Sequence, residues 1–140
     1  MINKQQSESD IIKIPEKVTF YETPIATYWV DEYGIVCAIA KPIRRKIEHY
    51  EEVMALYAKL MKGGKKLCLL SEITNMPFRS EIREYVMAEM PKYIKANALV
   101  TNVVLERTVA ETFMNLYSTP IEMNQFTNEV DAKAWLKQYL

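Results

Sequence analysis

The 140-residue chain is poor in the residues that build dedicated chemical sites: it has three glycines, two cysteines and one histidine. A glycine-rich loop that cradles phosphate groups is therefore not expected. With His49 as the single histidine and no cysteine pair at ligand spacing, we expect no zinc site, and no cofactor is indicated. The 18 basic and 18 acidic residues cancel, which argues against a nucleic-acid partner recruited by net charge.

Long apolar runs are also missing. No run reaches the about 18 residues of a membrane-spanning helix, and the first ten residues lack the apolar core of a signal peptide. Cys37 and Cys68 lie in apolar, strand-like runs, which is typical of buried thiols in a reducing compartment. We therefore expect a cytoplasmic protein without a transmembrane segment.

The rest of the composition is that of an ordinary globular protein, with 49% hydrophobic and 26% charged residues. A chain of this length can bury a core without disulfides or metals. We expect a flexible lead-in over residues 1–15 and a single domain over residues 16–140.

Hydrophobic periodicity predicts alternating strands and helices. The predicted strands are residues 18–22, 25–31, 35–40, 66–71, 98–105 and 121–126. The predicted helices are residues 47–61, a helix capped by Ser80 and ended by Pro91, residues 108–117, and a last helix capped by Thr127 or Asn128. The turn at residues 31–34 predicts a hairpin between the second and third strands.

The order is β-β-β-α-β-α-β-α-β-α. Such alternation requires right-handed crossovers. It predicts an α/β domain with a mixed, mostly parallel sheet of five to six strands and about four helices.

Residues 70–81, LSEITNMPFRSE, form the end of a strand, a polar loop and the start of a helix. This segment, and FTNEVDAKAWL at residues 126–136, resemble the STAS family of anti-sigma-factor antagonists, also called SpoIIAA-like, whose fold is related to lipid-binding SEC14 domains. Glu72 corresponds to the family's strand-end acid. Ser80 stands at its usual aspartate and Glu81 at its usual phospho-acceptor, which is a departure from the family pattern.

The resemblance implies a non-enzymatic bacterial regulatory or protein-interaction module. It implies a working surface on this loop and the helix after it, with an exposed apolar patch near Phe78 and Ile82. The predicted binding or regulatory residues are Glu72, Thr74, Asn75, Phe78, Arg79, Ser80 and Arg83. The partner is an unidentified protein, and a homodimer is left open.

Ser80 has two interpretations. As an N-cap, its hydroxyl would accept a hydrogen bond from a backbone N–H, which contributes about 1 kcal/mol. As a phospho-acceptor, it would place a phosphate at the positive end of the helix, beside Arg79 and Arg83. Thr74 and Ser71 are the other hydroxyls considered for such a modification.

Two further groups of residues stand out. The cations Lys41, Arg44, Arg45 and Lys46 precede a helix, where they either bind an anion or pair with nearby acids such as Glu48, Glu51 and Glu52. His49 has no neighbouring pattern typical of a catalytic histidine, so we expect no catalytic residue.

Methionines and aromatic residues recur at helical spacing. The set consists of Met54, Met61, Val86, Met87, Met90, Phe113, Met114 and Tyr117. These residues either fill the core or line an adaptable apolar groove. The second interpretation leads to an alternative function, which is the binding of a small apolar or anionic ligand in a SEC14-like pocket.

Overall fold

The computed structural model describes residues 12–72, 79–101 and 121–140. Its strands are β1 (Tyr21–Glu22), β2 (Ala26–Val30), β3 (Val36–Ala40), β4 (Leu67–Glu72), β5 (Ile94–Val100) and β6 (Glu122–Phe126). Its α-helices are α1 (Ile47–Leu60), α2 (Ser80–Glu89) and α4 (Glu129–Leu136), and short 3₁₀ helices follow α2 and α4. The predicted helix at residues 108–117 lies outside the described residues.

The six strands form one sheet in the order of the chain, β1 to β6. The first three strands are antiparallel neighbours, and β3 to β6 are parallel neighbours. The prediction of an α/β fold with a mostly parallel sheet is therefore confirmed. In the described ranges, no helix has the length and apolar character needed to cross a membrane.

The β2–β3 hairpin has the predicted turn. Asp31 Oδ1 accepts hydrogen bonds of 2.9 Å from the backbone N–H groups of Tyr33 and Ile35. Gly34 has a φ of +86°, a conformation that side chains with a Cβ rarely adopt. Local chemistry alone thus specifies this hairpin, which explains why it was predictable.

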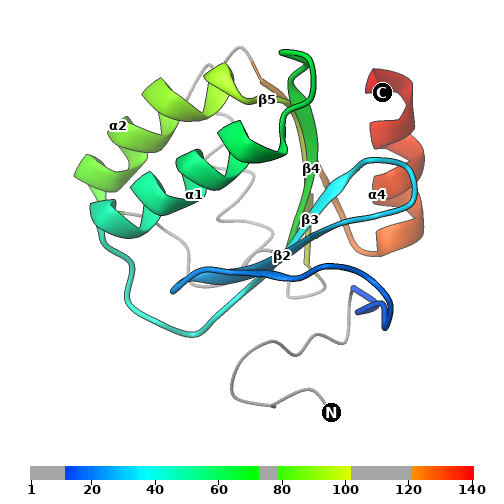
Figure 1. The fold of residues 1–140 in the computed structure, drawn as a ribbon, viewed down its shortest axis with the longest axis horizontal. Coiled ribbons are helices and arrows are strands. Elements are labelled where there is room, and N and C mark those ends of the chain that lie inside the picture. Colours follow the sequence, from blue (N-terminus) through cyan, green and yellow to red (C-terminus); the bar gives the residue numbers. More distant parts are fainter. Residues whose placement is uncertain (1–11, 73–78, 102–120) are drawn as a thin grey trace.

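Helices cover both faces of the sheet (Figure 1): α1 and α2 lie on one face and α4 lies on the other. Each face has its own buried cluster. Successive residues of the central strands alternate between the clusters, as a pleated strand requires. Leu69, for example, faces α1 and α2, whereas Cys68 and Leu70 lie in the α4 cluster.

The strand predicted at residues 98–105 begins earlier. It starts at Ile94, and Thr101 already lies beyond its end. The 3₁₀ turn at Met90–Lys92, which contains Pro91, ends the preceding helix and leads almost directly into the strand. Lys95 and Asn97 interrupt the apolar pattern, which hid the first half of the strand.

The prediction that Ser80 caps its helix is wrong. The N-cap is Arg79, which has extended backbone angles and makes no side-chain capping hydrogen bond. Ser80 is the first helical residue, and its hydroxyl accepts a 3.5 Å hydrogen bond from Arg83 Nη2. Glu81 supplies a negative charge in the first turn, which stabilises the helix start through its dipole without a side-chain cap.

The last helix begins as predicted. Asn128 is its N-cap, and the side-chain oxygen accepts a 2.8 Å hydrogen bond from the Asp131 N–H. Ala132 and Leu136 are fully buried against the sheet. Trp135 and Tyr139 are partly buried against the same cluster.

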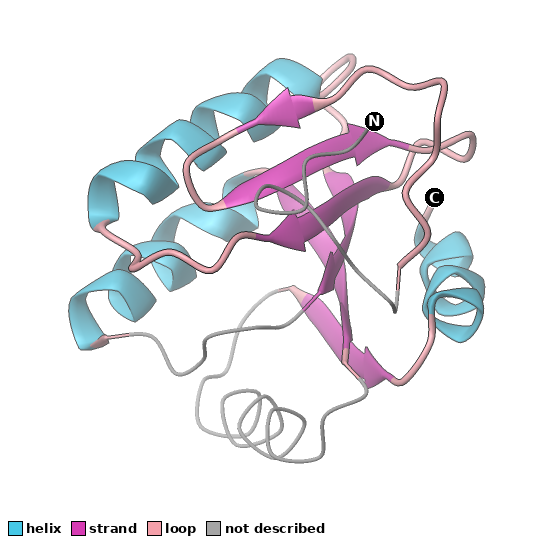
Figure 2. Cartoon of the chain, turned by 90° about the horizontal axis from the view of Figure 1, so that it is seen from below, coloured by secondary structure: helices cyan, strands magenta, loops and turns pink. Residues whose placement is uncertain are grey.

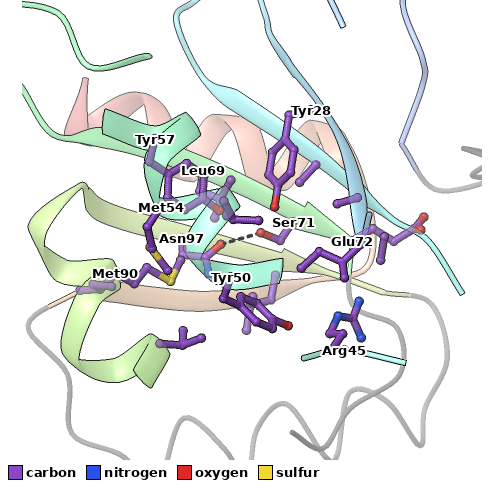
Figure 3. Close-up of a pocket in the computed structure, with 18 of the residues that line it drawn as sticks. Tyr28, Arg45, Tyr50, Met54, Tyr57, Leu69, Ser71, Glu72, Met90 and Asn97 are labelled. Carbon is purple, nitrogen blue, oxygen red and sulfur yellow. Dashed lines mark hydrogen bonds between the residues drawn. The ribbon is translucent and has the colours of Figure 1, made fainter. Parts of the chain in front are cut away.

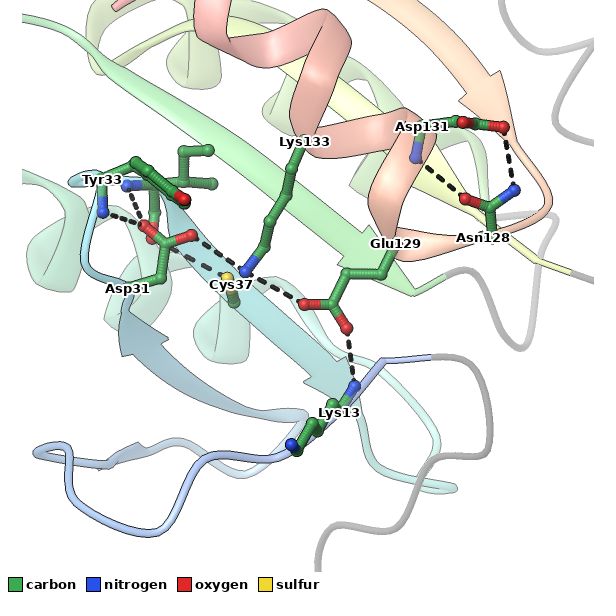
Figure 4. A network of polar contacts seen from close by, with 9 residues as sticks. Lys13, Asp31, Tyr33, Cys37, Asn128, Glu129, Asp131 and Lys133 are labelled. Carbon is green, nitrogen blue, oxygen red and sulfur yellow. Dashed lines mark hydrogen bonds and ion pairs between the residues drawn. The ribbon is translucent and has the colours of Figure 1, made fainter.

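An ion-pair network ties α4 to the hairpin (Figure 4). Lys133 Nζ lies 2.9 Å from Asp31 Oδ2 and 3.0 Å from Glu129 Oε2. The other Glu129 oxygen accepts a 2.7 Å hydrogen bond from the backbone N–H of Lys13. Burial alone would lower the pKa of Lys133, but its hydrogen bonds to Asp31 and Glu129 hold that pKa above its ordinary value. The network joins three segments that are distant in sequence.

We expect the substitution Lys133→Met to lower the free energy of unfolding by about 2 kcal/mol, because it leaves the largely buried Asp31 carboxylate without its cation. A raised lysine pKa stabilises the fold fully below the ordinary lysine value and loses that effect only at higher pH. The difference from wild type should therefore be constant between about pH 6 and 9. Urea denaturation measures it, with the exposed Lys65→Met as control. Equal stability of the two variants would show that the network contributes nothing.

Candidate functional site

A run of small side chains on neighbouring strands leaves space on the face of the sheet beneath α1 and α2. The strand registers place Tyr28 opposite Ala38, Ala38 opposite Ser71, and Ser71 opposite Leu99. Ala26 lies opposite Ala40 one row further along. Three alanines and a serine on adjacent strands cannot fill the distance to the covering helices as leucine or isoleucine would.

The result is a pocket of about 150 Å³ between the sheet and the two helices (Figure 3). Its walls come from strands β2 to β6 and from both helices. The apolar lining residues are Ile25, Ala26, Ala38, Ala40, Val53, Met54, Leu69, Val86, Met87, Met90, Leu99, Ile121 and Met123. The described polar lining residues are Tyr28, Arg45, Tyr50, Tyr57, Ser71, Glu72 and Asn97.

A polar pair lies on the floor of the pocket. Ser71 Oγ donates a 3.2 Å hydrogen bond to Asn97 Oδ1. Asn97 is only 5% exposed, although a buried amide in a central strand is costly unless it is hydrogen-bonded. Its amide nitrogen carries two further donors. In Figure 3 the Tyr28 hydroxyl points toward this pair.

Two tyrosines form the wall next to this pair. The rings of Tyr28 and Tyr57 meet edge to face, with centroids 6.0 Å apart. Burial raises the pKa of both phenols above the ordinary value, and the two phenols share a hydrogen bond. Both therefore stay neutral at physiological pH and act as hydrogen-bonding groups.

Charged residues lie at one end of the pocket. Arg45, from the segment before α1, lies there near Tyr50, and Glu72, at the end of β4, lines the same end with its carboxylate pointing away from both (Figure 3). Burial raises the pKa of Tyr50 to about 12, and the nearby Arg45 guanidinium, which shares a hydrogen bond with the phenol, lowers it in part. We refer to Arg45, Tyr50 and Glu72 as the polar end of the pocket.

The predicted site residues divide between two places. Glu72 is at the polar end of the pocket, but Arg79, Ser80 and Arg83 are not among the residues that line it. Arg79 forms an ion pair of 3.2 Å with Glu81. The other predicted residues, Thr74, Asn75 and Phe78, lie outside the described residues.

The apolar patch expected near Phe78 and Ile82 is not formed by Ile82. That side chain is 2% exposed and belongs to the cluster beneath α1 and α2. The helical periodicity correctly placed Ile82 on the apolar side of α2, but that side faces the sheet. The structure therefore removes one support for a protein-binding surface at this loop.

The basic cluster before α1 is divided by the fold. Lys41 forms a 2.9 Å ion pair with Glu22 and donates a hydrogen bond to the Thr23 carbonyl, whereas Arg45 reaches the pocket. His49 accepts a 3.0 Å hydrogen bond from the Lys46 N–H through Nδ1. That contact gives His49 a structural role in the first turn of α1.

Sequence reasoning missed Asn97, Tyr28 and Tyr50 as residues of the site. One usable signal was the polar Asn97 in the middle of an apolar strand, because asparagine is depleted from strands. The alternation of alanine in residues 36–40 was another. Eight residues at helical spacing were predicted to fill the core or line a groove. Met54, Val86, Met87 and Met90 line the pocket and Met61 does not; Phe113, Met114 and Tyr117 lie outside the described residues.

A family model described as "Domain of unknown function (DUF7793)" matches residues 28–140. The matched region includes every described pocket residue except Ile25 and Ala26. No curated protein and no solved structure matches the chain.

We expect the variant Tyr50→Phe to lose less stability than the wild-type protein as the pH rises into the alkaline range. A raised phenol pKa means that the folded state keeps its proton while the unfolded state loses it. The phenol's contribution is therefore full below about pH 10, the ordinary tyrosine value, and is lost as the pH rises toward 12. Between pH 9 and 11 the free energy of unfolding should fall by up to about 1 kcal/mol less in the variant than in the wild type. Denaturation at each pH measures it, with the exposed Tyr33→Phe as control; identical slopes for all three proteins would contradict the prediction.

Proposed function

The chain belongs to the DUF7793 family, whose domain has no assigned function, and we propose that it binds a small, largely apolar ligand in the pocket between α1, α2 and the sheet. The observation that carries the proposal is a pocket walled mainly by aliphatic and methionine side chains with a few convergent polar groups. That combination is typical of small-molecule sites.

The size of the pocket limits the ligand. A volume of about 150 Å³ resembles that of apolar cavities that accept benzene, and it is smaller than sites for drug-sized molecules. A short acyl chain or a single aromatic ring fits this description. Burying about 200 Å² of such a ligand contributes about 5 kcal/mol, before the cost of lost translational and rotational freedom. That gross free energy alone would correspond to about 0.2 mM, and the lost freedom weakens binding, so we expect a dissociation constant on the order of 1 mM or above for simple probes.

The ligand-binding function is favoured over the regulatory or protein-interaction function that the STAS resemblance implies. The burial of Ile82 and the position of Glu72 in the pocket lining both support ligand binding. The interaction module, the STAS relationship, the homodimer and the absence of enzymatic activity stay predictions from the sequence.

A binding experiment can use the methionine methyl groups. In a protein labelled with ¹³C at these methyls, octanol should shift the signals of Met54, Met87, Met90 and Met123, all of which line the pocket. The Met61 signal serves as an internal control, because this residue lies just beyond the end of α1 and outside the lining. Titration to several millimolar with no shift of the pocket signals would refute the proposal.

Filling the pocket should abolish this binding. Ala38→Leu places a larger side chain on its floor, so octanol should bind at least about tenfold more weakly, a loss of about 1.4 kcal/mol. Ala55→Leu makes the same chemical change on the exposed side of α1 and should leave affinity unchanged. Thermal denaturation checks that both variants are folded. Equal affinities for octanol would place the binding site elsewhere.

A further inference from the structure

We infer that the ligand is a small monocarboxylate, held with its carboxylate at the polar end of the pocket and its apolar tail toward the methionines. This inference rests on the proposed function and specifies the class of ligand for the same site. It is drawn from how charge and apolar surface are distributed along the pocket.

The pocket is asymmetric. Met54 and Met90 lie at one end in Figure 3, and Arg45, Tyr50 and Glu72 lie at the other. Methionine is flexible and polarizable, so it adapts to tails of different shape. A ligand that is apolar at one end and polar at the other matches this distribution in one orientation only.

Arg45 determines the sign of the charge that the ligand's polar group should carry. Among the described residues that line the pocket it is the only cation. Its planar guanidinium can bind a carboxylate through two parallel hydrogen bonds. A guanidinium has five N–H donors, so Arg45 can serve Tyr50 and a ligand together. The Tyr50 phenol is neutral at physiological pH, and its O–H group can donate to the same carboxylate.

Glu72 lines the same end of the pocket, but in Figure 3 its carboxylate points away from Arg45 and Tyr50. The opposite end is lined by methionines, which offer no partner for a second charge. This distribution favours a ligand with one carboxylate and an apolar tail.

The test compares three probes with the same eight-carbon chain: octanoate, octanol and octylamine. Each is titrated at neutral pH into the methyl-labelled protein. We expect octanoate to bind about tenfold more tightly than octanol, a difference of about 1.4 kcal/mol, and octylamine to bind most weakly.

Variants then assign the effect to residues. Arg45→Gln should bring octanoate to the affinity of octanol, and Arg45→Lys should restore part of the difference. The neighbouring, exposed Arg44→Gln is the matched control and should change neither affinity. Octanol binding by every variant shows that its pocket is intact.

The outcomes separate the two claims. If octanol binds as tightly as octanoate to the wild-type protein, the monocarboxylate inference fails and the apolar pocket function stands. An equal loss of octanoate affinity in Arg44→Gln and Arg45→Gln also overturns the inference, because it indicates a diffuse charge effect. If no probe shifts the pocket methyl signals, the proposed function itself fails.

Discussion

The burial of strands β3, β4 and β5 on both faces is the constraint on which the rest of the structure depends. Parallel neighbours occur where helices cover both faces of a sheet, and the buried residues of these strands divide between the α4 cluster and the cluster beneath α1 and α2. The α4 face satisfies this with a closely packed cluster that includes Trp29, Leu70 and Leu136. The opposite face, with its small side chains, leaves the pocket.

The two faces carry different polar groups. The cluster beneath α4 includes both cysteine thiols, and the ion pairs of Lys133 with Asp31 and Glu129 lie beside it. Burial raises the pKa of Cys37 to about 12, so this thiol stays protonated and unreactive at neutral pH. The face beneath α1 and α2 holds the Ser71–Asn97 pair and three buried tyrosines. Placing these polar groups around a pocket costs packing and desolvation that an all-apolar interior would avoid.

The ion-pair network on the α4 side has a different role. It closes the hairpin turn, α4 and the Lys13 segment into one unit. Figure 2 shows α4 on the opposite side of the sheet from α1 and α2, the helices that cover the pocket. Ile12 is buried in the same cluster, which extends the packed part of the chain to that residue. The stability of the fold and the chemistry of the pocket thus depend on different faces of the sheet.

Much of the fold could be predicted from local patterns. Apolar positions three and four residues apart identified α1, an Asx-type turn with glycine identified the hairpin, and Asn128 identified the start of α4. The start of β5 was wrong because Lys95 and Asn97 interrupt its apolar pattern, and the Ser80 cap was wrong because the chain enters the helix one residue earlier than the capping pattern suggests. The candidate site was predicted less well, because among the predicted binding residues that the structure describes, only Glu72 lines the pocket.

The amino-acid sequence by itself determined the fold class, the hairpin, the helix faces and the burial of the cysteines, since each depends on neighbours within a few residues along the chain. Only the tertiary structure decided that a pocket exists and which groups meet in it. Tyr28, Ser71 and Asn97 come from three different strands, and Arg45 comes from a connecting segment. Their proximity depends on strand register and on how closely two helices approach the sheet, which are properties of packing between distant segments.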